Sequence, residues 1–363
     1  MKIATVLGAR PQFIKAAPVS REISLDPALR EVIIHTGQHY DYNMSKCFFD
    51  DLGIPEPVCN LEVGSASHGR QTGEMVIGIE RVLMEERPDL VLVYGDTNST
   101  LAGALVAVKL HVPIAHVEAG LRSFNRRMPE ESNRVVTDHL SDLLFCPTDK
   151  SVANLARESV FGRVHLVGDV MRDCYSFFRD RAQEHSTVLE DLGLQELGST
   201  EPYCLATIHR PENTDDPARM DAILQGLSQV GTQVIIPLHP RTRAYLEKQG
   251  SRIGPNIRTV QPLAYFDMLI LEANAEVILT DSGGIQKEAF FAGVPCVTMR
   301  DETEWVELVE GGYNTLTGAD PGRIVRAVES SKERVLDFGV DIYGQGDSAV
   351  KIVETIRRVD LSE

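Results

Sequence analysis

Features that mark several large classes of protein are missing from this sequence of 363 residues. No stretch approaches the ~18 consecutive apolar residues of a membrane span. The apolar run before Gly8 is too short for the core of a signal peptide. Six cysteines lie far apart with no Cys-x-x-Cys pair, and a chain of this length needs no disulfides, so reduced thiols are expected. These absences predict a soluble, cytoplasmic protein that does not bind a membrane.

Positive charge is scarce in the chain. There are 36 Lys and Arg residues against 53 Asp and Glu residues, which gives a formal net charge of −17 at pH 7. Such a surface disfavours binding to nucleic acid or to an anionic membrane, because both are polyanions. If the substrate is also an anion, the fold has to gather a few basic side chains around it.

Common nucleotide and metal motifs are absent too. The sequence has neither the Gly-x-Gly-x-x-Gly of dinucleotide-binding folds nor the Gly-x-x-x-x-Gly-Lys-[Ser/Thr] phosphate loop. Tightly bound NAD and ATP-driven phosphoryl transfer are therefore disfavoured. There is no His-Glu-x-x-His, and His35 and His39 form no metal motif. We expect no cofactor and no zinc.

Short apolar runs alternate with amphipathic stretches along the whole chain, as in an α/β protein. Continuous Val/Ile/Leu strands separated by helices indicate parallel sheets buried on both faces. In the first half, strands are predicted at 3–7, 32–35, 90–94, 114–117, 143–146 and 164–167, with helices at 13–23, 100–110 and 131–139. After the polar stretch 179–202, strands are predicted at 203–208, 234–237, 257–260, 277–280 and 296–299, with helices at 219–231, 266–274 and 285–292.

The same pattern of strands and helices begins again after residue 202, which predicts two Rossmann-like, doubly wound domains. The first covers residues 1–170 and the second, which would bind the nucleotide, covers 171–346. The stretch 347–363 has apolar residues at a helical period and is expected to pack back on the first domain. In such folds substrates bind outside the carboxyl ends of the strands, so we expect both domains to face a central cleft.

Charged residues follow the predicted strands of the first half. Arg10 and Lys15 flank a helix start after Gly8, which suits an anion, although a solvated helix start is an equally good explanation. Asp96, Glu118 and Glu130 lie at strand ends or at a helix start. Asp96 alone would be explained as a helix cap. Three carboxylates that are expected at the same edge of the sheet suggest acid and base groups.

The second half repeats this placement with histidines and glycines. His209 and His239 follow its first two predicted strands. The turn Ser282-Gly283-Gly284 lies between a buried strand and a helix, where free amides and the helix dipole favour a diphosphate. Glu288 is placed to accept hydrogen bonds from ribose hydroxyls. A tight turn with a purely structural role is the alternative.

These motifs, taken in order, resemble the non-hydrolysing UDP-N-acetylglucosamine 2-epimerases over nearly the whole chain. Single motifs such as DSGG occur in other proteins, but the ordered set is highly specific. The matching stretches are GARPQFIK (8–15), HTGQH (35–39), YGDTNST (94–100), HVEAGLR (116–122), PEESNR (129–134), HRPEN (209–213), LTDSGGIQKEA (279–289) and MRDETEW (299–305).

The resemblance implies the glycosyltransferase-B type of fold and a homodimer. It also implies interconversion of UDP-GlcNAc and UDP-ManNAc without a redox cofactor, through elimination of UDP to 2-acetamidoglucal and readdition. Residue by residue, it assigns catalysis to Asp96, Glu118, Glu130 and His209. Substrate contacts fall on Arg10, Lys15, Arg134, Arg210, His239, Ser282, Gly283, Gly284 and Glu288, and a possible allosteric UDP-GlcNAc site on Gln38, His39, Arg70 and Gln71.

Other functions stay open at this stage. MRDETEWVELV and HTGQHYDYNMS resemble the branch that acts on UDP-2,3-diacetamido-2,3-dideoxyglucuronate, and Trp305 stands where well-known members have Arg. Leu263 and Met268 stand where those members have Gln and Phe near the uracil. A glycosyltransferase on the same fold would need an acceptor. A silent nucleotide-sugar sensor would not need three carboxylates beside an anionic substrate.

Overall fold

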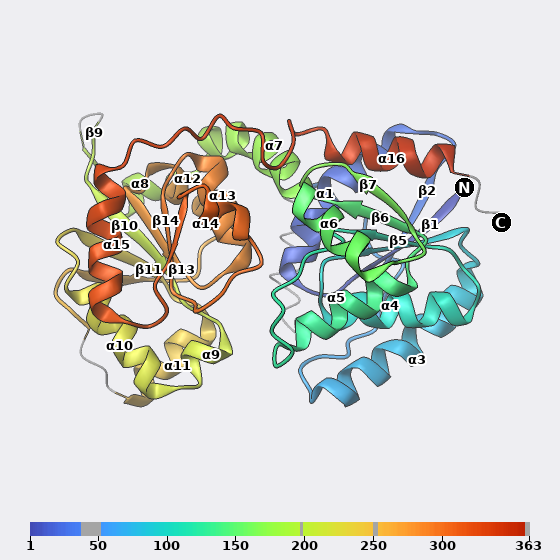
Figure 1. Cartoon of the computed structure of the whole chain (residues 1–363), viewed down its shortest axis with the longest axis horizontal. Coiled ribbons are helices and arrows are strands. Elements are labelled where there is room, and N and C mark those ends of the chain that lie inside the picture. Colours follow the sequence, from blue (N-terminus) through green and yellow to red (C-terminus); the bar gives the residue numbers. More distant parts are fainter. Residues whose placement is uncertain (38–51, 197–198, 250–252, 360–363) are drawn as a thin grey trace. The chain divides into compact units, whose positions relative to one another are not determined.

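The computed structural model describes residues 1–37, 52–196, 199–249 and 253–359. The chain divides into two compact units (Figure 1). Unit 1 is Met1–Cys174 together with Asp341–Glu363, and unit 2 is Tyr175–Val340. Each unit is an α/β layer structure around its own parallel sheet, as the sequence predicts.

Unit 1 contains a parallel sheet of seven strands in the order β3-β2-β1-β4-β5-β6-β7. All six predicted strands are present, with ends shifted by two residues or fewer. The strands are β1 Lys2–Leu7, β2 Arg30–His35, β3 Cys59–Asn60, β4 Leu90–Tyr94, β5 Ile114–Val117, β6 Leu143–Cys146 and β7 Arg163–Leu166. The strand order reverses between β1 and β4, so the crevice of a doubly wound sheet lies outside the carboxyl ends of these two strands.

Helices cover both faces of this sheet (Figure 1). Helices α1 and α16 contact one another on one face, and α3, α4 and α5 lie side by side on the other. The helices are α1 Arg10–Leu25, α3 His68–Glu86, α4 Asn98–Lys109, α5 Pro129–Leu140, α6 Asp149–Glu158, α7 Val170–His185, which continues into unit 2, and α16 Ser348–Arg358. The predicted helices did not include α3, although it buries Met75, Ile79 and Val82.

Unit 2 has a six-stranded parallel sheet in the order β12-β11-β10-β13-β14-β15. All five predicted strands are present, and β15 was not predicted. The strands are β10 Tyr203–Thr207, β11 Gln233–Pro237, β12 Ile257–Val260, β13 Val277–Thr280, β14 Cys296–Thr298 and β15 Asn314–Leu316. The order reverses between β10 and β13, which places the crevice of this sheet after these two strands.

The helices of unit 2 also lie on both faces of its sheet (Figure 1). They are α8 Val188–Asp191, α9 Pro211–Thr214, α10 Pro217–Ser228, α11 Pro240–Gln249, α12 Tyr265–Asn274, α13 Gly283–Ala292, α14 Val306–Glu310 and α15 Pro321–Glu333. Helix α12 contacts α13, and α10 contacts α15. A short antiparallel pair, β8 Gln195–Glu196 with β9 Ser199–Thr200, lies within the stretch predicted only as polar.

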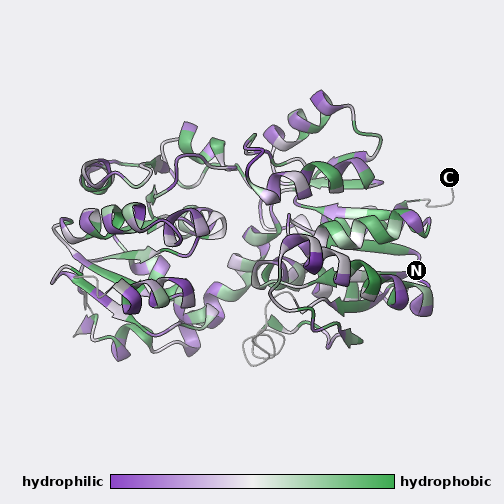
Figure 2. Ribbon diagram, turned by 90° about the horizontal axis from the view of Figure 1, so that it is seen from below, coloured by the Kyte–Doolittle hydropathy of each residue, from purple (hydrophilic) through white to green (hydrophobic). Residues whose placement is uncertain are grey.

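The central strands of both sheets are buried, and hydrophobic residues concentrate on them (Figure 2). The helices show hydrophobic and hydrophilic residues on different sides, as expected for layers that cover a sheet. Among the described residues, no helix is both long enough and apolar enough to cross a membrane.

Candidate active site

The first loop of unit 1 is held by a glutamine that sequence analysis did not single out. The side-chain Oε1 of Gln12 accepts hydrogen bonds from the backbone amides of Gly8 (2.9 Å) and Ala9 (3.1 Å). Its Nε2 donates to the Tyr94 carbonyl at 3.0 Å. Gln12 therefore joins the ends of β1 and β4, the two strands that border the crevice. Arg10 begins α1, and its side chain lies outside the described part of the structure.

Lys15 lies one turn further along α1 and forms an ion pair with Glu118. Both side chains are largely buried, with 12% and 6% of their surface exposed. A Cβ on Gly95 would lie 3.1 Å from Lys15 Nζ and 3.2 Å from Glu118 Oε2. The loops after β1, β4 and β5 therefore meet at this ion pair, and Gly95 leaves the space for it.

Glu118 directly follows β5 and has a left-handed backbone conformation, with φ of 71°. For a residue with a Cβ this conformation is strained and has to be held by its surroundings. The amides of Glu118 and Ala119 both donate to the Phe145 carbonyl, at 3.1 and 3.0 Å. The sequence predicted a carboxylate at this strand end, but it gave no sign of the strain.

Asp96 is paired with Arg134, a residue on α5. Arg134 Nη2 lies 2.6 Å from Asp96 Oδ2, and Arg134 Nη1 lies 2.7 Å from Glu131 Oε2. Glu131 also accepts from the backbone amides of Ser123 (2.9 Å) and Phe124 (2.8 Å). Burial raises the pKa of Glu131, but these amides and Arg134 outweigh it, so the net pKa is lowered. Glu131 thus fixes the loop at Ser123 and Phe124. The sequence analysis did not include it among the site residues.

Glu130 is half-buried in the first turn of α5. Within the described ranges it has no hydrogen-bond or ion-pair partner. The structure therefore brings Lys15 to Glu118 and Arg134 to Asp96, while Glu130 forms no hydrogen bond or ion pair with these described residues.

A buried network lies behind the two paired carboxylates. His116 Nδ1 is 2.7 Å from Asp138 Oδ1, and His116 Nε2 is 2.7 Å from the Gly95 carbonyl. Asp138 Oδ2 accepts from the Gly120 amide (3.1 Å) and from Arg122 Nη1 (2.7 Å). Burial raises the pKa of Asp138, but His116 and Arg122 lower it more, so the carboxyl is held as the anion.

In unit 2, a buried aspartate orients the first predicted histidine. Asp281 is fully buried and accepts from the amides of His209 and Arg210 at 3.0 Å. Its Oδ1 also lies 3.3 Å from His209 Nδ1. The His209 and His239 rings are 5.2 Å apart between centroids. The structure therefore brings the two predicted histidines together, and Asp281 is a further functional candidate that the sequence motif contained but did not explain.

The predicted diphosphate turn is the start of α13. Ser282 is the N-cap residue, and Gly283 and Gly284 form the first turn. A Cβ on Gly283 would overlap Glu304 Oε1, so a larger residue there has to displace the Glu304 carboxylate. Arg300 Nη1 forms a 2.9 Å ion pair with buried Glu304. Free amides and a helix dipole next to basic side chains are suited to an anion.

One turn further along α13, two charged residues are buried. Lys287 is completely buried, with its Nζ 4.0 Å from the centroid of the Trp305 ring, a cation–π contact. Glu288 is 6% exposed. Trp305, the residue that departs from the expected motif, therefore packs directly on the helix that begins with the diphosphate turn.

The candidate allosteric residues fall in two places. Gln38 and His39 lie outside the described residues. Arg70 and Gln71 are adjacent on α3. Arg70 is exposed and pairs with Glu74 at 2.8 Å, while Gln71 is buried and accepts from Asn98 Nδ2 at 2.7 Å. Gln71 is therefore tied to the start of α4, two residues after Asp96.

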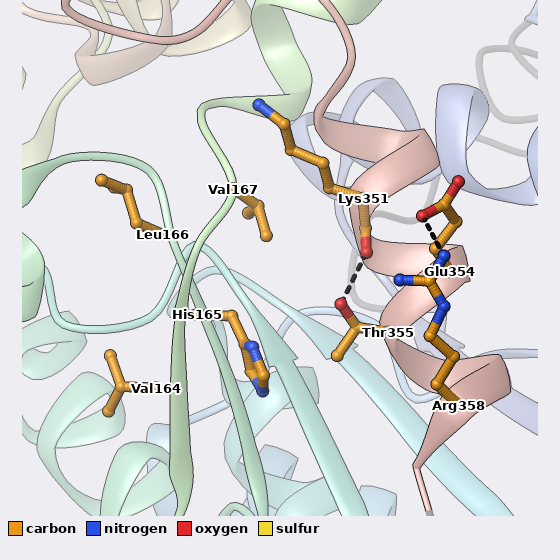
Figure 3. A pocket seen from close by; sticks show the side chains of 8 residues that line it. All are labelled: Val164, His165, Leu166, Val167, Lys351, Glu354, Thr355 and Arg358. Atoms are coloured by element: carbon orange, nitrogen blue, oxygen red, sulfur yellow. Dashed lines mark hydrogen bonds and ion pairs between the residues drawn. The ribbon is translucent and has the colours of Figure 1, made fainter.

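A cavity of about 400 Å³ lies away from these residues, between β7 and α16 (Figure 3). Its cations are matched by carboxylates, since Arg358 pairs with Glu354 at 2.9 Å and Lys351 with Asp347 at 2.8 Å. None of the predicted site residues lines it. In the part of the chain that the structure describes, no group of three or more His, Cys, Asp or Glu side chains could hold a metal ion.

Comparison with known proteins agrees with the chemistry of these groups. The family model described as UDP-N-acetylglucosamine 2-epimerase matches residues 21–357. The chain is 49% identical to the UDP-2,3-diacetamido-2,3-dideoxy-D-glucuronate 2-epimerase of Pseudomonas aeruginosa, over 99% of this chain and 100% of that protein. It is 42% identical to the UDP-N-acetylglucosamine 2-epimerase of Methanocaldococcus jannaschii, over 98% and 99%.

Solved structures give the same result. The crystal structure of the Methanocaldococcus jannaschii UDP-GlcNAc 2-epimerase in complex with UDP-GlcNAc and UDP is similar at a TM-score of 0.92 and 42% identity, covering 99% of this chain and 100% of that one. The Neisseria meningitidis UDP-GlcNAc 2-epimerase bound to UDP-GlcNAc is similar at a TM-score of 0.88 and 30% identity, with 99% and 100% covered.

Proposed function

The chain belongs to the UDP-N-acetylglucosamine 2-epimerase family, and from this premise we propose that it is an isomerase that inverts C2 of UDP-N-acetylglucosamine to give UDP-N-acetylmannosamine. The observation that carries the proposal is the pairing of each strand-end carboxylate with a cation in unit 1. Asp96 pairs with Arg134 at 2.6 Å, and Glu118 pairs with Lys15.

The chemistry explains why such groups are needed. The C2 proton of the sugar is barely acidic, so its removal has to be coupled to the departure of UDP from C1. Elimination gives 2-acetamidoglucal and UDP, both of which stay bound. Readdition of UDP to C1, with a proton delivered to the opposite face of C2, completes the inversion. Carboxylates near C2 would exchange the protons, and cations and amides around the diphosphate would stabilise the leaving group.

For unit 1 we propose that Asp96, Glu118 and Glu130 are the acid and base groups. Half-buried Glu130 is available for proton exchange, since it has no partner among the described residues. The basic residues at the same sheet edge, Arg10, Lys15 and Arg134, are proposed to hold the substrate.

For unit 2 we propose that the Ser282-Gly283-Gly284 turn holds the diphosphate of UDP. Its position at the N-terminus of α13 supports this role, because the first amides of a helix lack intrahelical partners. His209 is assigned to catalysis and Glu288 to the ribose. Arg210 and His239 complete the proposed contacts.

A second substrate is favoured by a specific observation. The 49% identical relative acts, by its name, on UDP-2,3-diacetamido-2,3-dideoxy-D-glucuronate. In this chain Trp305 packs on Lys287 one turn after the diphosphate turn, at a position where the resemblance led us to expect arginine. A UDP-sugar with altered substituents at C3 and C6 is therefore the second candidate substrate, and the reaction at C2 would be the same.

We also propose a homodimer located in the cytoplasm, with an optional UDP-GlcNAc regulatory site at Gln38, His39, Arg70 and Gln71. Free thiols at Cys59, Cys146, Cys204 and Cys296 suit a reducing compartment. The proposed domains are 1–170 and 171–346, with the helix in 347–363 packing on the first. The burial of Ile352 and Ile356 on α16 and its contacts with α1 support that packing.

The test is incubation with UDP-GlcNAc in D2O, followed by proton NMR of the sugar C2 position. We expect the C2 proton signal to disappear while UDP-ManNAc resonances appear. The same incubation with the diacetamido-glucuronate nucleotide distinguishes the two substrates, because only the true substrate will exchange rapidly. An unchanged spectrum with both nucleotides would contradict the epimerase function.

A further inference from the structure

The network of His116, Asp138 and Arg122 touches both loops that carry proposed acid and base residues. Asp138, on α5, binds the chain on either side of Glu118. It meets His116, two residues before, and Gly120 and Arg122, two and four residues after. The opposite nitrogen of His116 meets the carbonyl of Gly95, which directly precedes Asp96.

The ring of His116 is held at both of its nitrogens in this arrangement. The Gly95 carbonyl only accepts hydrogen bonds. Asp138 is held as the anion, and its second oxygen already accepts from the Gly120 amide and Arg122. Both nitrogens of His116 are 2.7 Å from these oxygens, so the ring joins Asp138 to the Gly95 carbonyl. His116 is fully buried, so no water can replace either partner.

Stability alone is a weak explanation for such a network. Buried ion pairs add little net free energy, because the loss of hydration offsets their attraction. The effect of the network of His116, Asp138 and Arg122 is to fix the local geometry. Glu118 has a φ of 71°, and a strained residue keeps such a conformation only where its surroundings enforce it. Asp138 ties down both flanks of that residue.

The network also fixes the separation of the two loops. The amide of Gly95 donates to the Val117 carbonyl at 3.0 Å, and His116 donates to the Gly95 carbonyl at 2.7 Å. Gly95 is thus held through both of its backbone polar groups by the strand that leads to Glu118. Acid and base groups have to stand at a fixed distance from the reacting carbon, and an error of about 1 Å can lower the rate about 10²-fold.

We propose that His116 and Asp138 are positioning residues of the epimerase reaction, in which the buried His116 ring, held between Asp138 and the Gly95 carbonyl, sets the placement of Asp96 and Glu118. This inference rests on the proposed function. Neither residue is proposed to touch the sugar.

The hydrogen bonds of His116 are tested on the unaltered protein by proton NMR of its histidine ring N–H groups. The His116 signal is assigned by its loss in His116→Gln. We expect a ring N–H that exchanges slowly with solvent, because the ring is buried and hydrogen-bonded. A His116 ring N–H that exchanges as fast as that of an exposed histidine would overturn the proposal. This measurement does not depend on the variants folding well.

The positioning role is tested by the kinetics of His116→Gln and Asp138→Asn. We expect kcat to fall about 10²-fold while KM changes less than about threefold, because the substrate contacts remain and only the reacting groups shift. His165→Gln is the matched control, since His165 lies on β7 of the same sheet and forms no hydrogen bond to either loop within the described residues. It should keep the wild-type kcat.

The outcomes separate the two proposals. A wild-type protein that fails to exchange the C2 proton of either nucleotide would overturn the proposed function. Active wild type with unchanged kcat in both variants would overturn the positioning role alone. A parallel loss of kcat, UDP binding and thermal stability would also overturn it, because that pattern reports general unfolding. UDP titration of each variant therefore accompanies the rate measurements.

Discussion

At the scale of single residues, the proposed chemistry depends on two ion-paired carboxylates. Glu118 forms its ion pair with Lys15, and Asp96 with Arg134. In the proposed reaction these carboxylates exchange the protons at C2. The cation beside each one is also placed to meet an anionic substrate. In the proposed reaction each pair would serve proton transfer and substrate binding together.

We expect Asp96→Asn and Glu118→Gln to lower kcat by about 10² to 10⁴-fold, the usual size of a lost acid or base group. UDP should still bind, because the proposed diphosphate turn lies on α13 in unit 2. The measurement is C2 deuterium exchange by NMR together with UDP titration. The exposed-surface control Glu329→Gln on α15 should behave as wild type. Near-normal rates in both site variants would refute the assignment.

Gly283 gives a second prediction at this scale. Because a Cβ there would overlap Glu304 Oε1, Gly283→Ala has to displace the buried Glu304 carboxylate, which pairs with Arg300 next to the diphosphate turn. We expect UDP affinity to fall at least about tenfold, a loss of about 1.4 kcal/mol. Calorimetric titration of UDP checks it, with Gly231→Ala as control, because the space around Gly231 is open.

At the scale of elements, α16 shows how a helix near the C-terminus is attached to unit 1, most of which is formed by Met1–Cys174. Its buried residues Ile352 and Ile356 lie on one side, and it contacts α1. Its N-cap residue Asp347 makes no side-chain cap hydrogen bond. Instead Asp173, on α7, accepts from the Ala349 amide at 2.7 Å. A carboxylate from another helix thus occupies the N-terminal end of α16, where the dipole favours negative charge.

Burial raises the pKa of Asp173 to about 6, above the ordinary value of 3.8. The folded protein therefore holds this proton more tightly than the unfolded chain, and stability falls as pH rises from about 4 through about 6. The total loss is about 3 kcal/mol at most, from the 1.36 kcal/mol that each pKa unit represents. Asp173→Asn has no charge to bury and should lose less stability over this window.

Thermal unfolding between about pH 4 and about pH 7 measures the effect. Asp180→Asn is the control, since Asp180 is exposed on the same helix. Asp173→Asn should be more stable than wild type at the upper end of the window, and Asp180→Asn should follow the wild-type curve. Identical pH dependence in all three proteins would show that Asp173 does not control this attachment.

At the scale of the whole molecule, the chain builds the same pattern twice. Each unit has a parallel sheet whose strand order reverses once, and the proposed site residues follow the strands at each reversal. In unit 1 these are β1 and β4, with β5 beside them, and in unit 2 they are β10 and β13. Because the net charge is −17, an anionic nucleotide would be favoured only where basic side chains or the free amides of a helix N-terminus offset that charge locally.

Binding of UDP should therefore stabilise the whole chain measurably. At a UDP concentration of 100 times Kd, linkage predicts about 2.7 kcal/mol of added stability. Thermal unfolding with and without UDP checks this, and uridine, which lacks the phosphates, should give a much smaller shift. Equal shifts with UDP and uridine would contradict a diphosphate site at the start of α13.

Particular residues show how much of the fold and of the candidate site could be predicted from the sequence. The strands were predicted because each is a short run of apolar residues, a pattern that is local. Asp96, Glu118 and His209 were singled out for the same reason, since each lies within two residues of the end of such a run. The helix α3 was missed, although its moderate amphipathic pattern was present. The two-residue strand β3 was too short to give a signal.

By itself, the sequence determined two α/β units with parallel sheets and the residues at their strand ends, because strand and helix periodicity depend on near neighbours along the chain. Only the tertiary structure decided the order of the strands and the partners of the site residues. Asp138 meets His116 from 22 positions away, and Asp281 meets the His209 amide from 72. Such contacts, and the strained backbone of Glu118 that they enclose, arise only when segments distant in sequence pack together.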